Sequence, residues 1–156
     1  MPLNTSYIVK TIRLLDMEFR IFERACAALG GLERAQLMQE AVLFEAFRLG
    51  VRYSAHRPRP REEPWPYLPY RHGETVTEVR VSISMRITVA ELMSIAAEHV
   101  KASETLFCVG STLAYIGRLQ SCYQGIQAES PEVAKETRAA LRRIKLPEQY
   151  LYGAPG

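Results

Sequence analysis

Two stretches of the chain alternate between apolar and polar residues, and each is followed by patterns typical of helices. The alternation is rough over residues 7–15 and strict over residues 79–87. Because successive side chains of a strand point to opposite faces, both stretches are predicted to be short strands with one buried face. The residues expected on the buried faces are Ile12, Leu14, Val81, Ile83 and Met85.

Two predicted helices follow the first strand. Apolar residues at helical spacing mark residues 17–29, with Asp16 placed to cap the start of the helix. Gly30 and Gly31 are expected to end it, because glycine readily adopts the left-handed conformation found after many helices. The next helix, residues 32–50, is apolar over more than one stripe, which is typical of a helix with protein on several sides.

The second strand is followed by the same order of elements. Thr88 is predicted to cap a helix over residues 89–102, and Ser103 a longer helix that extends to about residue 123. An offset of 71 residues, which places Ile12 on Ile83, aligns the two units without a gap. A repeated unit with a broadly apolar second helix predicts that the two copies bury each other.

The repeat divides the chain into four segments. Residues 1–51 form the first unit and residues 79–128 the second, and the two are expected to share one core. The linker between them, residues 52–78, is rich in proline, arginine and aromatic residues, and its prolines exclude a regular helix. The last segment, residues 129–156, contains a further predicted helix that starts at Ser130.

Composition narrows the class of protein only a little. The chain has 156 residues, 47% of them hydrophobic, which suits a compact domain with a sizeable core. Its net charge of +3 is spread evenly, so charge alone does not indicate nucleic-acid binding. We see no signal peptide and no apolar run long enough for a membrane span. The three cysteines are widely spaced, and we expect a cytoplasmic protein.

Signals of catalysis are weak. His56, His72 and His99 are not spaced as metal ligands, and neither a glycine-rich phosphate loop nor a nucleophile elbow is present. Cys26 and Cys108 lie in apolar surroundings and are expected to be buried rather than nucleophilic. We therefore expect no enzyme activity, no catalytic residue, no metal site and no cofactor.

A short strand followed by two helices, present twice, resembles the ribbon-helix-helix family of Arc and MetJ type. The resemblance covers about residues 7–50 and 79–123. It implies a mainly α fold, a tandem ribbon-helix-helix pseudo-dimer with a two-stranded antiparallel ribbon, to which the C-terminal helix is added. In that family the ribbon enters the major groove of double-stranded DNA.

Fusion of two units in one chain is similar to the accessory proteins of conjugative relaxosomes. That likeness implies a monomeric pseudo-dimer that binds double-stranded DNA and assists DNA transfer, with a relaxase or another transfer protein as a further partner. A transcriptional repressor is the alternative role on DNA. Further self-association on DNA is left open.

The outward face of the ribbon supplies the candidates for base reading. Arginine can bond guanine in bidentate fashion, serine and threonine can bond several base edges, and a methyl group can touch thymine. The alternative for the same residues is a solvated sheet face without a ligand. The candidates are Val9, Thr11, Arg13, Arg80, Ser82, Ser84 and Arg86.

Weaker candidates lie near the start of each second helix and in the linker. Helix N-termini can hold phosphates, which gives the candidates Lys10, Leu32, Arg34, Lys101 and Ser103. In the linker, the candidates for contact with DNA are Arg57, Arg59 and Arg61. The alternative for this segment, including Trp65, Tyr67 and Tyr70, is packing across a hydrophobic surface.

A rival function is a helical protein-interaction module whose strands pair but read no DNA. The low net charge supports it, as do Glu33 and Glu104, which put acidic groups in the first turns of both second helices. Such groups oppose phosphate binding, although they also stabilise helices.

Overall fold

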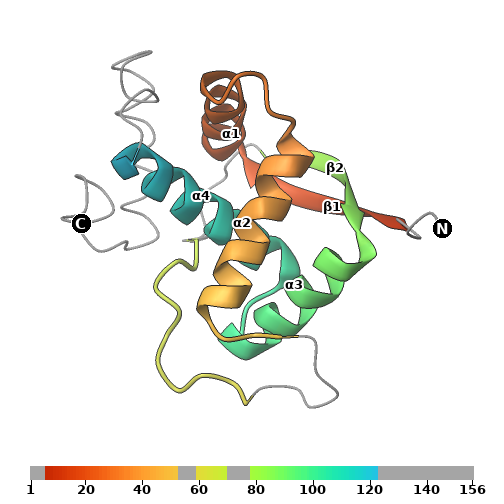
Figure 1. The fold of residues 1–156 in the computed structure, drawn as a ribbon, viewed down its shortest axis with the longest axis vertical. Coiled ribbons are helices and arrows are strands. Elements are labelled where there is room, and N and C mark those ends of the chain that lie inside the picture. Colours follow the sequence, from red (N-terminus) through yellow and green to blue (C-terminus); the bar gives the residue numbers. More distant parts are fainter. Residues whose placement is uncertain (1–5, 53–58, 70–77, 123–156) are drawn as a thin grey trace.

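A computed structural model of the chain describes residues 6–52, 59–69 and 78–122. Within those residues the fold is mixed but mainly helical, with four helices and a two-stranded antiparallel sheet (Figure 1). The elements in chain order are β1 (Tyr7–Leu15), α1 (Asp16–Ala28), α2 (Arg34–Arg48), β2 (Glu78–Arg86), α3 (Ile87–Val100) and α4 (Glu104–Cys122).

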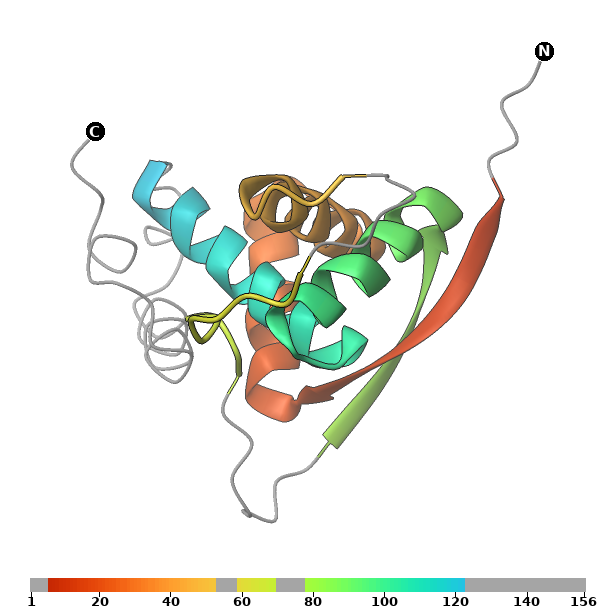
Figure 2. The same ribbon diagram turned by 90° about the horizontal axis from the view of Figure 1, so that it is seen from below.

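The strands β1 and β2 pair as a ribbon that lies along one side of the helices (Figure 2). Thr11 stands opposite Ser82 at the middle of the register, and these two residues are themselves 71 positions apart. The same offset carries the bounds of β1 onto those of β2. The pairing is therefore symmetric about Thr11 and Ser82, so each half of the ribbon repeats the backbone arrangement of the other.

One hydrophobic core underlies both units. Its largest buried side chains come from β1, β2 and all four helices, and they form one continuous cluster. The members of this cluster on the inner face of the ribbon are Ile12, Leu14, Val81, Ile83 and Met85, as the alternation predicted. Neither unit has a separate core, which explains why α2 and α4 are apolar over more than one stripe.

Two predicted helix caps are wrong. Helices α1 and α3 begin at Asp16 and Ile87, directly after the strands, so Asp16 and Thr88 lie in first turns and not at the cap positions. At the start of α1 the buried carboxylate of Glu18 instead accepts a hydrogen bond of 2.8 Å from the backbone N–H of Leu15. At the start of α3 the equivalent N–H, that of Arg86, instead donates a hydrogen bond of 2.9 Å to the side chain of Gln39 in α2.

The other predicted helix boundaries agree more closely with the structure. Ser103 caps α4, because its Oγ accepts a hydrogen bond of 3.1 Å from the N–H of Leu106. Gly30 and Gly31 end α1 with φ of 82° and 83°. Helix α2 is two residues shorter at each end than predicted, and Gly50, at φ 79°, follows its C-terminus.

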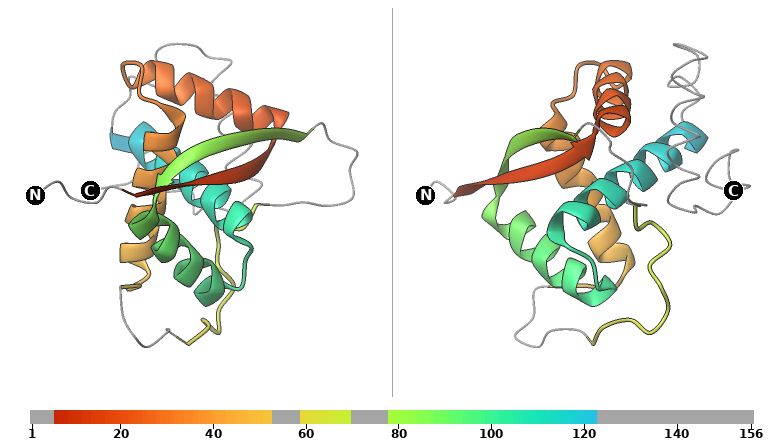
Figure 3. Two further views of the ribbon diagram at one scale, coloured as in Figure 1. Left: turned by 90° about the vertical axis from the view of Figure 1, so that its right-hand side faces the viewer. Right: turned by 180° about the vertical axis from the view of Figure 1, so that it is seen from behind.

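The described part of the linker, residues 59–69, runs past α4 on the side away from the ribbon (Figure 3). Trp65 and Tyr67 are buried there, and the indole of Trp65 stacks on Phe107 with ring centroids 5.0 Å apart. Gly110 allows this approach, since a Cβ at its position would lie 2.2 Å from the carbonyl oxygen of Tyr67. The predicted helix starting at Ser130 lies outside the described residues.

Over residues 6–52, 59–69 and 78–122, no helix combines the length and the apolar character that a membrane span requires.

Candidate nucleic-acid interface

The outward face of the ribbon consists of four cross-strand pairs. Because directly opposite residues share a face, each pair presents its two side chains together. All seven predicted base-reading residues are exposed on this face. From the free end of β1 to its end at α1, the pairs are Tyr7–Arg86, Val9–Ser84, Thr11–Ser82 and Arg13–Arg80.

Tyr7 belongs to this face but was not among the predicted residues. It is 51% exposed and lies opposite Arg86. The signal was present in the sequence, because Tyr7 has the same parity as Val9 and Thr11 in the predicted strand.

Arg13 and Arg80 lie directly opposite each other, an arrangement that destabilises a sheet by like-charge repulsion. Among the described residues, neither guanidinium makes an ion pair or a hydrogen bond. Glu78 is the acidic residue nearest in the strand, two positions from Arg80, and it is exposed. Two cations without a counter-ion on one exposed face form a favourable place for an anion.

A hollow lies beside the ribbon where α4 begins. Ser103 and Thr105 line it from the helix, and Thr11, Arg13 and Arg80 line it from the ribbon. Ser103 is occupied as a helix cap, so its hydroxyl oxygen is already an acceptor.

A second hollow lies beside the ribbon where α2 begins. Leu32 and Arg34 line it, together with Ser82 and Ser84 of β2. The 71-residue offset equates Leu32 with Ser103 and Ser82 with Thr11, so the two hollows occupy equivalent positions on either side of the ribbon. The structure thus brings Leu32, Arg34 and Ser103 next to the outward face.

The predicted phosphate-binding cations are less available than the sequence suggested. Lys10 pairs with Glu104 at 3.2 Å, and Arg34 pairs with Glu23 at 3.0 Å. Lys101 is exposed at the end of α3 and lines neither hollow. Both ion pairs are partly exposed, and pairs of this kind contribute little stability, so a phosphate could compete for either cation.

The linker arginines are placed by backbone contacts at the end of α3. The Nδ1 of His99 donates a hydrogen bond of 2.7 Å to the carbonyl of Arg59, and the N–H of Arg61 donates one of 2.8 Å to the carbonyl of His99. The Arg61 side chain pairs with Glu63 at 3.7 Å. Arg57 lies outside the described residues.

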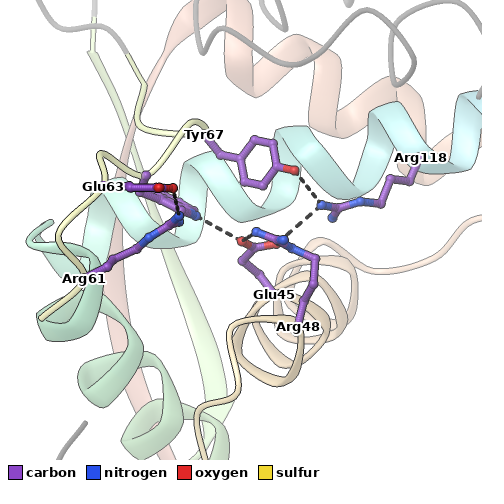
Figure 4. Close-up of polar contacts among 7 residues, drawn as sticks. Glu45, Arg48, Arg61, Glu63, Tyr67 and Arg118 are labelled. Atoms are coloured by element: carbon purple, nitrogen blue, oxygen red, sulfur yellow. Dashed lines mark hydrogen bonds and ion pairs between the residues drawn. The ribbon is translucent and has the colours of Figure 1, made fainter. Parts of the chain in front are cut away.

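The linker aromatics are held by a polar cluster around the buried carboxylate of Glu45, which is made of Glu45, Arg48, Trp65, Tyr67 and Arg118. Figure 4 shows the Glu45 carboxylate next to the Arg48 guanidinium, with Arg118 reaching both Glu45 and the Tyr67 hydroxyl, which accepts from Arg118 at 3.0 Å. Since Trp65 and Tyr67 are buried, they are not available to stack on bases, and packing across a hydrophobic surface is the observed alternative. Tyr70 lies outside the described residues.

The cysteines offer no accessible thiolate where the structure describes them. Complete burial raises the pKa of the Cys108 thiol to about 12. The pKa of Cys26 is raised by burial and, secondarily, by the negative charge of Glu23. The side chain of Cys122 lies outside the described residues. Over the described part of the chain, no three His, Cys, Asp or Glu side chains gather as they would around a metal ion.

Comparison with known proteins adds no family: no protein-family model matches the chain, and neither a curated protein nor a solved structure matches it.

Proposed function

We propose that this protein is a tandem ribbon-helix-helix pseudo-dimer that binds double-stranded DNA with the outward face of β1 and β2. The order strand, helix, helix occurs twice, and the register is symmetric about Thr11 and Ser82. Such symmetry is what two fused copies of one unit would produce. Strands in a sheet lie about 4.8 Å apart, so a two-stranded ribbon fits a major groove about 12 Å wide.

The observation that carries the proposal is the outward pair Arg13–Arg80, which has no counter-ion among the described residues and lies at one end of the exposed face. A solvated sheet face gains nothing from opposing two arginines, whereas guanine bases and phosphates would satisfy both.

The two hollows supply positions for the DNA backbone. Each brings the N-terminus of a helix, α2 or α4, beside the ribbon, and such N-termini favour phosphate through their free amides and dipole. Their equivalent placement would let the protein contact phosphates on both sides of one groove.

The role on DNA is recruitment or regulation without chemistry and without a cofactor. An accessory factor for conjugative DNA transfer is the role we favour, because two units fused in one chain are similar to relaxosome accessory proteins. A transcriptional repressor is the other. A binding site at a transfer origin indicates the first role, and a site at the protein's own promoter indicates the second.

The test is a titration of the full chain into pooled random double-stranded DNA at two salt concentrations, followed by sequencing of the bound fraction. We expect enrichment of a short motif and a steep loss of affinity at the higher salt. The double variant Arg13→Ala, Arg80→Ala should lose the motif and remain folded.

A matched control removes two exposed arginines that are not among the candidates for contact with DNA, Arg24→Ala with Arg52→Ala. This variant has the same net charge as the ribbon variant and should keep the motif. If the wild type fails to bind DNA even at low salt, the proposal is wrong.

A protein-interaction module is the second candidate, and exposed aromatic side chains on α2 favour it. Phe44 and Phe47 remain 44% and 47% exposed, and Phe44 contacts Tyr115 of α4. This module would be indifferent to substitution of Arg13 and Arg80, so the same variants distinguish the two functions.

A further inference from the structure

We infer that the DNA site is not palindromic, with guanines read at the Arg13–Arg80 end of the ribbon and a thymine read at the Val9–Ser84 end. This inference rests on the proposed function and deepens it by assigning a base preference to each end.

The backbone of the ribbon is symmetric, but its side chains are not. Under the 71-residue offset, Arg13 corresponds to Ser84 and Val9 corresponds to Arg80. The two pairs on either side of the centre therefore occupy equivalent places and carry different chemistry. A homodimer would present identical pairs at these places, and would favour a palindrome.

The Arg13–Arg80 end is suited to guanine. A guanidinium can donate two hydrogen bonds to O6 and N7 of one guanine, and the repulsion between the two arginines disfavours their sharing a base. Two guanines in neighbouring base pairs would satisfy both side chains.

The Val9–Ser84 end is suited to thymine. Val9 is 66% exposed, the largest exposed fraction among the large hydrophobic side chains of the described residues. Its side chain has no hydrogen-bonding group, so the base feature that it can recognise in the major groove is the thymine methyl. The Ser84 hydroxyl lies opposite Val9 and can either donate or accept a hydrogen bond. It is therefore compatible with both the adenine and the thymine of an A·T pair.

The outer positions increase the difference between the ends. Beyond Val9–Ser84 the ribbon carries Tyr7 and Arg86, both exposed, whereas beyond Arg13–Arg80 it carries Glu78 opposite the buried Leu15. One end of the ribbon is therefore extended by a cation and the other by an acid.

The spacing of the two base preferences follows from strand geometry. Val9 and Arg13 are four residues apart, which corresponds to about 13 Å along an extended strand. The axial rise of DNA is about 3.4 Å per base pair and the groove runs obliquely to the axis, so the thymine and the guanines should be separated by at most about four base pairs.

The experiment is selection from random double-stranded DNA with the wild type and with a variant in which the two pairs beside the centre of the ribbon are identical. Val9→Arg with Ser84→Arg gives the second end the same pair of arginines as the first. We expect a non-palindromic motif for the wild type and a palindromic motif with guanines at both ends for the variant. Both changed positions are exposed, and circular dichroism would check that the fold is retained.

A milder variant, Val9→Ala, keeps the test informative if the double variant does not fold. It should relax the thymine preference and leave the guanine preference unchanged, with a loss of roughly tenfold in affinity for the selected site.

A palindromic wild-type motif, or a Val9→Ala variant that keeps the thymine preference, would overturn this inference while leaving DNA binding in place. Absence of any wild-type binding at low salt would instead remove the proposed function itself.

Discussion

Glu45 is fully buried, and its carboxylate is held by donors from three parts of the chain. Arg48 donates to both oxygens, at 2.8 and 2.6 Å, and the indole N–H of Trp65 donates at 3.0 Å. Arg118 approaches to 3.5 Å. A buried carboxylate without such partners would be very unfavourable, so these residues depend on one another.

Glu45→Ala should lower the free energy of unfolding by about 3 kcal/mol, because it removes a fully buried carboxylate that Trp65 and Arg118 both contact. Urea denaturation would measure the change. Glu40→Ala on the same helix, which removes a hydrogen bond to Gln36 at the surface, should change stability by less than about 0.5 kcal/mol. Equal effects of the two substitutions would show that the buried cluster is not needed for stability.

Lys101 adopts a left-handed conformation, with φ of 61°, at the position that the repeat equates with Gly30. This conformation is unfavourable for a residue with a Cβ, and glycine adopts it freely. Lys101→Gly should therefore raise the free energy of unfolding by about 1 kcal/mol. The reciprocal change Gly30→Ala should lower it by a similar amount, and chemical denaturation of both variants checks the pair. A destabilised Lys101→Gly protein would contradict the explanation.

At the scale of elements, the linker and α4 approach each other closely at Gly110. Gly110 leaves room for the backbone of Tyr67 and the ring of Trp65, which would lie 2.2 and 2.8 Å from an added Cβ. Backbone cannot move aside as easily as the end of a flexible side chain, so the linker would have to shift as a unit.

Gly110→Ala should therefore destabilise the protein by about 2 kcal/mol and weaken the packing of Trp65, which a change in tryptophan fluorescence would report. Its effect on DNA affinity should be small, because the linker lies away from the ribbon. Ser111→Ala is the matched control. The buried Ser111 hydroxyl has no hydrogen-bond partner among the described residues, so its removal should be neutral or stabilising. Unchanged stability and fluorescence in Gly110→Ala would refute the close approach.

Most elements could be predicted from the sequence because their patterns are local. Alternation located both strands and their inner faces, and Ser103 and the Gly30–Gly31 pair marked helix boundaries correctly. The starts of α1 and α3 could not be placed in this way, because strand and helix join without a connecting residue. There, Asp16 looked like a cap and the buried Glu18 supplies the acceptor.

The buried cluster and the ion pairs beside the ribbon were not predictable from local patterns. Glu45 is a polar residue within α2, and its partners Trp65 and Arg118 lie 20 and 73 residues away in the sequence. Likewise, the partner of Lys10 is Glu104, 94 residues away. Such contacts depend on how the two units pack together, which periodicity does not specify.

At the scale of the whole molecule, the two units are parts of one folding unit. The core is continuous across them, and Glu45 of the first unit relies on Trp65 and Arg118 from outside it. In a dimer of two first units, Phe47 would take the place of Arg118, because the 71-residue offset makes these two positions equivalent. Glu45 would then be buried without the Arg118 cation.

A fragment of residues 1–51 should therefore lack stable structure, with weak helical circular dichroism and no cooperative melting. Mixing it with a fragment of residues 52–156 should restore helical signal and a single transition, while the intact chain should unfold in one step. Cooperative melting of the first fragment alone, as a monomer or self-associated, would contradict a shared core.

The presence of both ribbon strands in one polypeptide has a consequence for dilution. A ribbon assembled from two subunits separates when the concentration falls below the dissociation constant of the dimer. A covalent connection keeps the second strand at a high effective concentration whatever the amount of protein. Occupancy of a DNA site would then rise in proportion to the protein concentration, without a dimerisation step. Even at a few molecules per cell, each molecule would keep its two-stranded ribbon assembled.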